Sequence, residues 1–369
     1  MHDDVVHARQ RPDDSLTKRD VMMLVRTGAF CCLSFLIHGL AVGEPAYQIR
    51  EKITYSTVGD RELLLDAFIP NEAGEHPAVL VVHGGAWRSG NRKQLRAYAT
   101  TLASRGFVCF AIDYRLAPKH KFPAQIEDCR TAVKWIRKNA SQYKVNPDRV
   151  GAIGYSAGGH LVSLLATTGT PPSEKNGNVD TRIQVAAAGG APTDFRWFPD
   201  NGRWAEFWMG GNLTSEKDKF QAASSAAFVD AGDAPLFFFH GSADELVPEA
   251  WTKACYFELK SAGVKTEFYS IANAGHMQAA MDPSALEKAC DFLAAVLMPE
   301  SKLARSGEID TSAHTGDSAS SSSDKGSASK ADSSSKADSS SKADSASKAD
   351  SASKADSPSD AASSRVSDR

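Results

Sequence analysis

The sequence predicts an α/β fold, in which helices cover both faces of one mostly parallel sheet with an antiparallel N-terminal edge. Short runs that are apolar on both faces, such as "PAVLVVHG" at 77–84 and "DRVGAIGYS" at 148–156, indicate buried parallel strands. Longer segments between such runs place apolar residues at helical spacing. Two earlier runs, 50–57 and 62–69, flank a Gly-Asp turn and indicate an antiparallel hairpin at the sheet edge.

The remaining elements continue this alternation of strand and helix. A helix is expected within 122–143, because Pro123 suits a first helical turn and an apolar stripe follows it. A last helix is expected at 284–297. Further apolar strands are expected at 106–114, 183–190, 234–241 and 265–272. The pattern is a βα repeat that builds one wide sheet.

Composition divides the chain into three parts, of which the first, 1–43, is expected to be a signal peptide. An apolar run at 27–42 ends in small residues that suit cleavage, and it is too short for a comfortable membrane span. Translation from Met22 or Met23 would remove the acidic segment in front of it. The alternative interpretation of the run is an apolar core helix. Export to the periplasm or the cell exterior, with no stable membrane span in the mature chain, is therefore expected.

The second part, 44–300, is the expected catalytic domain, and the third, 301–369, is expected to be a disordered tail. The tail is built from Ser, Ala, Asp and Lys, and its lysines recur every six residues from Lys330 to Lys354. Such a composition buries too little apolar surface to offset its ordering entropy. A spacer or surface-attachment role and a repeat without a specific role are both open. The formal net charge of −3 gives no reason to expect nucleic acid as a partner.

Four cysteines lie in apolar patterns of the middle region and are widely spaced, which does not favour a zinc site. They are Cys109, Cys129, Cys255 and Cys290. Buried thiols are the commoner outcome for such residues. An exported protein could also pair two of them, and the spacing does not say which.

The segment Gly154-Tyr155-Ser156-Ala157-Gly158 has the G-x-S-x-G pattern between an apparent strand and an apparent helix. In that context the serine occupies a sharp turn that lifts its hydroxyl clear of the sheet, at the positive end of a helix. Small residues are needed two positions before and after it. The sequence therefore predicts Ser156 as a nucleophile, and a glycine-rich turn without catalysis is the alternative.

A serine nucleophile needs a base and an acid that orients the base, and both should follow later strands of the sheet. Asp244 comes directly after the run at 234–241, and its neighbour Glu245 is the less favoured alternative. His276 follows the next run and is the expected base. His240 ends a strand and is expected to be a structural residue under the acid loop. The chain order Ser, Asp, His is that of the α/β-hydrolases.

A site for the developing oxyanion is expected in "HGGAW" at 83–87. The N–H groups of Gly85 and Ala86, with that of Ala157, could donate to the oxyanion. A plain turn is the alternative. Trp87 and Tyr155 are expected to contact substrate. A later aromatic group is expected to form either a core face or a substrate platform; its members are Trp197, Phe198, Trp204, Phe207 and Trp208.

Taken together, "HGGAW", "DYRLAPKHKFPA", "GYSAGG", "HGSADELVP" and "AGH" resemble the α/β-hydrolase superfamily over about 48–298. They are similar to the esterase/lipase group related to hormone-sensitive lipase, and more closely to its feruloyl- and acetylxylan-esterase-like branch. Ala86 replaces the usual third glycine of the oxyanion loop, and Tyr155 replaces the usual acidic residue of the elbow. The resemblance implies that Asp113, Arg115 and Asp128 support the neighbouring loop.

The resemblance implies a serine carboxylic-ester hydrolase that needs no metal or cofactor. Its expected substrates are small-molecule or polysaccharide esters, such as acetyl or feruloyl groups on polysaccharide. Two alternatives stay open: an amidase or peptidase of the same fold, and a non-catalytic surface-binding protein. The sequence does not fix the acyl group, the alcohol or the oligomeric state.

Overall fold

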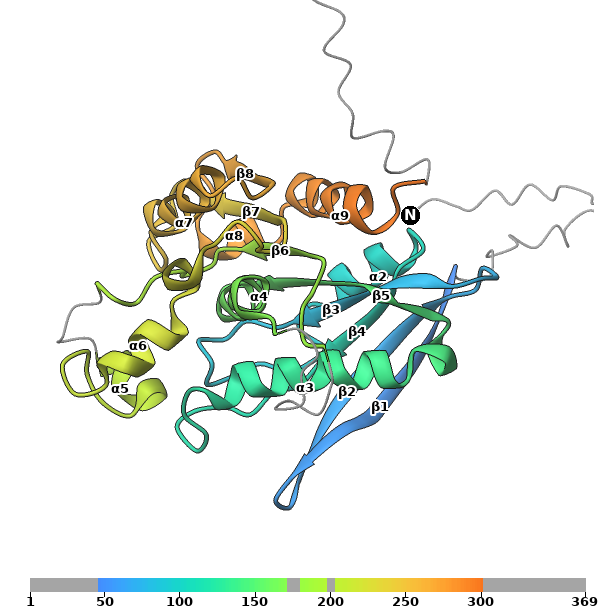
Figure 1. The fold of residues 1–369 in the computed structure, drawn as a ribbon, viewed down its shortest axis with the longest axis horizontal. Helices are drawn as coiled ribbons and strands as arrows, with labels where there is room; N and C mark the ends of the chain where they lie inside the picture. Colours follow the sequence, from blue (N-terminus) through green and yellow to red (C-terminus); the bar gives the residue numbers. More distant parts are fainter. Residues whose placement is uncertain (1–45, 171–179, 198–202, 301–369) are drawn as a thin grey trace, which may run out of the picture. The chain divides into compact units, whose positions relative to one another are not determined.

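The computed structural model describes residues 46–170, 180–197 and 203–300 (Figure 1). The predictions made for the signal peptide, 1–43, and for the tail, 301–369, lie outside these residues. In the part of the chain that is described, no helix is both long and apolar enough to cross a membrane.

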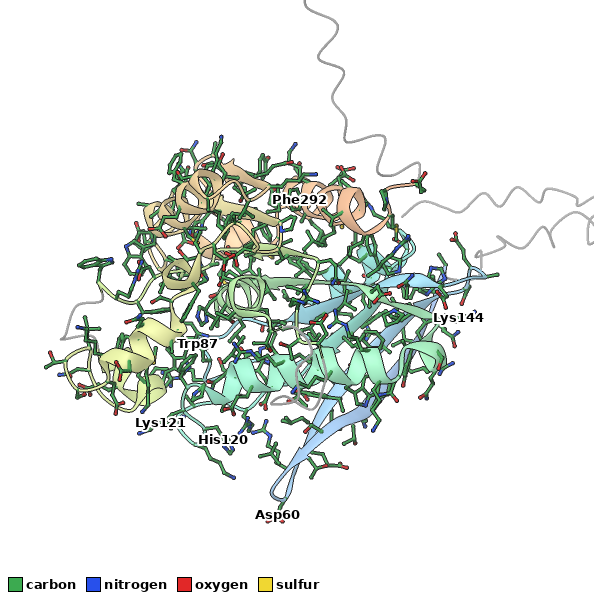
Figure 2. The ribbon with its side chains drawn as sticks, viewed as in Figure 1. Asp60, Trp87, His120, Lys121, Lys144 and Phe292 are labelled. Atoms are coloured by element: carbon green, nitrogen blue, oxygen red, sulfur yellow. The ribbon has the colours of Figure 1, made fainter. Side chains whose placement is uncertain are left out.

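The described strands form one eight-stranded sheet in the order β1-β2-β4-β3-β5-β6-β7-β8 (Figure 1). Both β1–β2 and β2–β4 are antiparallel, and every later pair is parallel. Asp60 lies at the tip of the β1–β2 hairpin (Figure 2). The strands are β1 (Tyr47–Val58), β2 (Arg61–Pro70), β3 (His76–Val82), β4 (Val108–Ile112), β5 (Val145–Tyr155), β6 (Val185–Gly189), β7 (Leu236–Gly241) and β8 (Thr266–Ile271). The prediction of a mostly parallel sheet with an antiparallel edge is confirmed.

Helices follow most of the parallel strands, as the alternation predicts. The helix expected near Pro123 begins at Ala124, and the last helix has Pro283 in its first turn and Asp282 as its N-cap, accepting from the Ala285 amide at 2.7 Å. The helices are α2 (Arg96–Ala103), α3 (Ala124–Lys138), α4 (Ala157–Thr168), α5 (Arg203–Met209), α6 (Lys217–Ala223), α7 (Glu249–Ser261), α8 (His276–Ala280) and α9 (Pro283–Leu297), with 3₁₀ turns η1 (Ala140–Tyr143) and η3 (Ser225–Phe228).

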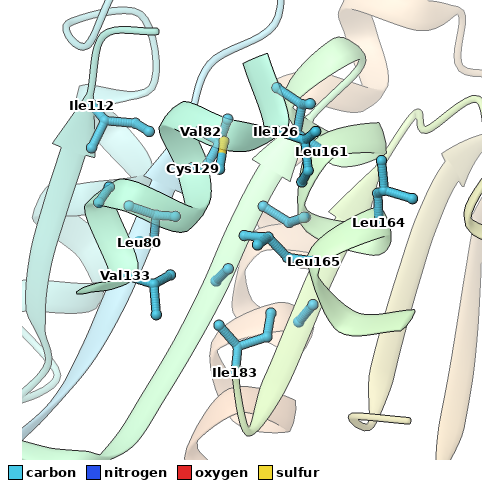
Figure 3. Close-up of a cluster of buried hydrophobic side chains, with 14 of the residues drawn as sticks. Leu80, Val82, Ile112, Ile126, Cys129, Val133, Leu161, Leu164, Leu165 and Ile183 are labelled. Atoms are coloured by element: carbon cyan, nitrogen blue, oxygen red, sulfur yellow. The ribbon is translucent and has the colours of Figure 1, made fainter. Parts of the chain in front are cut away.

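Two apolar clusters fill the space between the sheet and the helices on its two faces. In β3 the side chains of Leu80 and Val82 belong to one cluster and those of Val79 and Val81 to the other. The first cluster packs against α3, α4 and α7, and the second against α2 and α9. Figure 3 shows the first cluster between the strands and the helices α3 and α4. Each fully buried Leu or Val contributes about 1.5–3 kcal/mol, so the sheet is a rigid support for the loops at its edge.

Two half-buried arginines form ion pairs that hold the loops next to the antiparallel edge. Arg92 bridges Asp66 at 2.7 Å and Asp113 at 2.8 Å, and Arg115 contacts Asp128 at 2.7 Å. The amide of Arg115 also donates to Asp128 at 2.8 Å. The structural role that the family resemblance implies for the loop after β4 agrees with these contacts.

The four cysteines of the described region are buried free thiols. The prediction of buried unpaired cysteines is confirmed, and none of the four forms a disulfide. Among the described residues, no group of three or more His, Cys, Asp or Glu side chains is placed to hold a metal ion.

Candidate active site

Ser156 lies between β5 and α4, in a backbone conformation that L-residues rarely adopt, with φ 57° and ψ −121°. A Cβ atom on Gly154 would lie 2.4 Å from the Gly158 carbonyl oxygen, and one on Gly158 would lie 2.0 Å from that of Val82. Only glycine fits at either position. The strain at such a residue is about 1–3 kcal/mol, and the Ser156 amide, which donates to Gly189 O at 2.7 Å, helps to hold the turn.

The structure brings Ser156, His276 and Asp244 into one hydrogen-bonded chain. His276 Nε2 lies 2.9 Å from Ser156 Oγ, and His276 Nδ1 lies 2.6 Å from Asp244 Oδ2. A carboxylate only accepts, so Nδ1 carries the ring proton and Nε2 is left to accept from the serine hydroxyl. This is the arrangement in which an imidazole can remove a proton from a serine.

Asp244 is buried in a loop that fixes both of its oxygens. Its Oδ1 accepts from the amides of Leu246 at 3.0 Å and Val247 at 2.9 Å, while Oδ2 faces His276. Glu245 is exposed to solvent. The structure therefore places Asp244, and not Glu245, against the imidazole.

The loop after β3 lies beside the serine, and its Gly85 and Ala86 line the same cavity as Ser156. Gly85, Ala86 and Trp87 have consecutive positive φ angles of 108°, 50° and 58°, and the Gly85 carbonyl accepts from the amide of Ser89 at 3.0 Å. The amides of Gly85 and Ala86 donate to no group in the part of the chain that the structure describes. Ala157 is the first residue of α4, where helix amides lack intrahelical partners. These amides are free to hold an anionic oxygen beside Ser156.

A cavity of about 770 Å³ opens in front of Ser156 and His276. One wall comes from α2 and the other from α8 and the start of α9, and the hydroxyl of Tyr98 donates to Ala280 O at 2.7 Å between them. Gly85 and Ala86 also line it. The apolar wall residues are Leu95, Tyr98, Leu246, Met277, Met281 and Leu286. Reacting groups thus face a largely apolar chamber.

The model of one protein family, BD-FAE, matches residues 65–259 of this chain. The chain belongs to the BD-FAE family. The match covers β2 to α7 and includes both the serine elbow and Asp244, while His276 lies beyond its end.

Two curated relatives of this BD-FAE protein come from Mycobacterium tuberculosis. Esterase LipQ is 31% identical over 230 residues, which is 59% of this chain and 55% of LipQ. The probable carboxylic ester hydrolase LipM is 30% identical over 206 residues, which is 53% of this chain and 48% of LipM. The chain therefore spans about half the length of these relatives.

Two solved structures share the fold of the BD-FAE chain. An esterase from Thermogutta terrifontis, Est2 with butyrate bound, has a TM-score of 0.58 and 26% identity, covering 70% of this chain and 97% of its own. A truncated carbohydrate esterase from gut microbiota has a TM-score of 0.61 and 23% identity, covering 68% and 97%. At that identity the second likeness shows the fold alone.

The prediction that Trp87 contacts substrate is wrong, because Trp87 is a core residue. Its side chain, labelled in Figure 2, is 3% exposed and does not line the cavity. The indole stacks on Trp208 with ring centroids 3.7 Å apart, and its Nε1 donates to His160 Nδ1 at 3.2 Å. Packing of this large ring against a second indole stabilises the loop after β3.

The aromatic residues at 197–208 were expected to form either a core face or a substrate platform. Trp208 is part of the core, and Trp197 is not. Trp208 is fully buried, and Trp197 is 83% exposed. Phe207 is half-buried under the Arg88 guanidinium, 5.3 Å from its ring centroid. Phe198 and the side chain of Trp204 lie outside the described residues.

Tyr155 lines the cavity and also contacts His276; its contact with substrate stays a prediction. Its hydroxyl donates to the backbone oxygen of His276 at 2.5 Å, and its ring packs against the imidazole with centroids 5.2 Å apart. Burial raises the pKa of the phenol, so the hydroxyl keeps its proton and remains a donor. Tyr155 could be placed beside Ser156 from the sequence alone, but no local pattern indicates its hydrogen bond to His276.

Proposed function

We propose that this chain is a serine carboxylic-ester hydrolase that works through an acyl-enzyme. The observation that carries the proposal is the hydrogen-bonded chain Ser156–His276–Asp244, which faces a cavity whose wall presents unpaired amides. The names of the relatives, esterase for LipQ and probable carboxylic ester hydrolase for LipM, support the reaction class.

In the first half-reaction Ser156 Oγ attacks the ester carbonyl while His276 Nε2 takes the hydroxyl proton. Asp244 keeps Nδ1 protonated and stabilises the imidazolium. The carbonyl oxygen becomes negative within reach of the amides of Gly85, Ala86 and Ala157, and each such donor lowers the barrier by about 3 kcal/mol. His276 then protonates the leaving alcohol. In the second half-reaction His276 removes a proton from water, which attacks the acyl carbon; the bond to Ser156 Oγ then breaks, His276 returns the proton to Oγ, and the acid is released.

The proposed substrates carry short-chain or aromatic acyl groups, such as acetyl or feruloyl groups on polysaccharide. The cavity volume of about 770 Å³ is ample for either group, and its apolar walls favour an ester part without charge. Met277 and Met281, which are 62% and 73% exposed, give the rim a flexible apolar surface. The related T. terrifontis esterase was solved with butyrate bound. Export through the N-terminal segment, which we also propose, would place the enzyme among extracellular polysaccharides.

The test uses the full purified chain and its Ser156→Ala variant on a panel of acetyl, butyryl, long-chain and feruloyl esters, ranked by kcat/KM. The wild type should hydrolyse short-chain or feruloyl esters fastest, and the variant should lose about a thousandfold or more in kcat. A Ser156→Ala variant with full activity would refute the assignment. A matched p-nitroanilide cleaved faster than its ester would favour the amidase alternative instead.

A fluorophosphonate probe distinguishes catalysis from the surface-binding alternative without choosing a substrate. A structure of T. terrifontis esterase 2 phosphorylated by paraoxon shows such chemistry in that relative. The wild-type chain should be labelled at Ser156 and the Ser156→Ala variant should not. A folded wild-type protein that takes up no label would refute the proposed nucleophile.

A further inference from the structure

A second histidine approaches the carboxylate oxygen that orients the base. His240, the second-last residue of β7, is fully buried, and its Nε2 lies 3.2 Å from Asp244 Oδ2. The same nitrogen lies 2.8 Å from the carbonyl oxygen of Val247. Both oxygens only accept hydrogen bonds, so Nε2 must carry a proton. The hydrogen bond at Nε2 is to Val247 O, and Asp244 Oδ2, which faces His276 Nδ1 at 2.6 Å, lies close to the same nitrogen.

The other nitrogen of the ring is held by α7. His240 Nδ1 lies 3.0 Å from Thr252 Oγ1, and that hydroxyl lies 2.6 Å from Ala191 O. These two contacts fix the ring plane, and the two acceptors beside Nε2 require a proton on that nitrogen.

We propose that His240 is a positioning residue for Asp244 that holds the acid loop in place and keeps Oδ2 toward His276. The proposal rests on the proposed ester hydrolase and adds a fourth side chain to it. The hydrogen bond of His240 Nε2 to Val247 O fixes the loop in which the Val247 amide donates to Asp244 Oδ1 at 2.9 Å. The buried ring also lies 3.2 Å from Oδ2, so it leaves Oδ2 little room to turn away from His276 Nδ1.

The charges around His240 agree with a neutral ring at neutral pH. Burial lowers the pKa of His240, the Val247 carbonyl and the carboxylates of Asp244 and Glu249 act in the opposite direction, and His276 acts with burial. These are the titratable groups that face it from the acid loop, α7 and α8. A neutral ring has one proton to give, and the acceptors require it on Nε2.

The test compares His240→Leu, which removes the donor at similar volume, with His240→Gln, whose amide can return an N–H near Nε2. For His240→Leu we expect kcat to fall about tenfold with KM within about twofold. His240→Gln should restore most of the lost kcat. Wild-type values in a folded His240→Leu would overturn the proposal, as would a His240→Gln that behaves like His240→Leu.

A second measurement needs neither an ester nor a variant. Nitrogen-15 NMR of the wild-type chain with labelled histidine should show His240 as the Nε2–H tautomer, and the Nδ1–H tautomer would overturn the proposal even if His240→Leu fails to fold. If the wild type hydrolyses no ester, the proposed function fails while these spectra still decide the role of His240.

Discussion

Asp244→Asn should nearly abolish the proposed activity while leaving the fold intact. Every neighbour of this carboxylate is a donor: the amides of Leu246 and Val247 meet Oδ1, and His276 Nδ1 meets Oδ2 at 2.6 Å. An asparagine amide nitrogen in the Oδ2 position would face the Nδ1 proton. In the Oδ1 position it would face the two backbone N–H groups instead. Neither orientation satisfies the site.

The clash between the two donors costs least free energy to remove if His276 moves its proton to Nε2, so that Nδ1 accepts from the new amide. Nε2 then carries a proton and can no longer accept from Ser156 Oγ at 2.9 Å. The wrong tautomer in a serine triad costs about 10⁴ in kcat, which is about 5 kcal/mol of barrier. Stopped-flow or steady-state kinetics of the hydrolysis of a short p-nitrophenyl ester measure this loss of kcat.

Glu245→Gln is the matched control. It also removes one negative charge, but from the exposed side chain of the residue next to Asp244. It should keep kcat within about twofold, since a solvated charge at that distance acts weakly. Thermal denaturation should show all three proteins folded. Asp244→Asn within tenfold of the wild type, or Glu245→Gln as damaged as Asp244→Asn, would refute the assignment of the acid.

Three further substitutions test the site around this chain. Tyr155→Phe removes the hydroxyl that donates to His276 O, so unfolding should cost about 1 kcal/mol less and kcat should fall, measured by denaturation and by ester hydrolysis. Gly158→Ala puts a Cβ atom 2.0 Å from Val82 O and should destabilise the fold by about 3 kcal/mol in urea; a wild-type midpoint would contradict the elbow geometry. Trp87→Phe weakens the stack in the core and should lower stability by about 1 kcal/mol, yet leave the ratio of acetyl to butyryl kcat/KM unchanged; a changed ratio would return Trp87 to the substrate site.

The strands could be predicted because local periodicity encodes how they are buried. The run containing Leu80 and Val81 is apolar on both faces, and its two faces meet helices on opposite sides of the sheet. The order of the strands is a different matter. β4 lies between β2 and β3, and nothing in three similar apolar runs says which pairs with which. Pairing is decided by contacts between segments far apart in the chain.

The meeting of Ser156, Asp244 and His276 could be predicted because parallel strands end at one edge of a sheet. Ser156, Asp244 and His276 each follow a different parallel strand, and their spacing in sequence was enough to expect them together. The residues around these three were harder to predict. Trp87 belongs to the loop at 83–87, but its indole stacks on Trp208 of α5, whose position could not be predicted from the sequence.

For His240, the sequence predicted the kind of residue but not its contact with Asp244. A histidine at the end of a strand was expected to be structural, and its contacts with Val247 and Thr252 are of that kind. The approach of Nε2 to Asp244 Oδ2 depends on how the loop after β7 folds back over its own strand. Four residues of sequence separation allow that contact without requiring it.

The groups that react and the groups that surround the substrate come from different parts of the fold. Ser156 and Asp244 sit on loops fixed by strand ends and buried hydrogen bonds, so their geometry tolerates little change. The cavity walls come from α2 and from α8; Met277 of α8 and Met281, just after it, are exposed. Substitutions on that rim can alter the shape of the cavity without moving Ser156 or Asp244. Specificity among esters should therefore change through α8 while the chemistry at the strand ends stays the same.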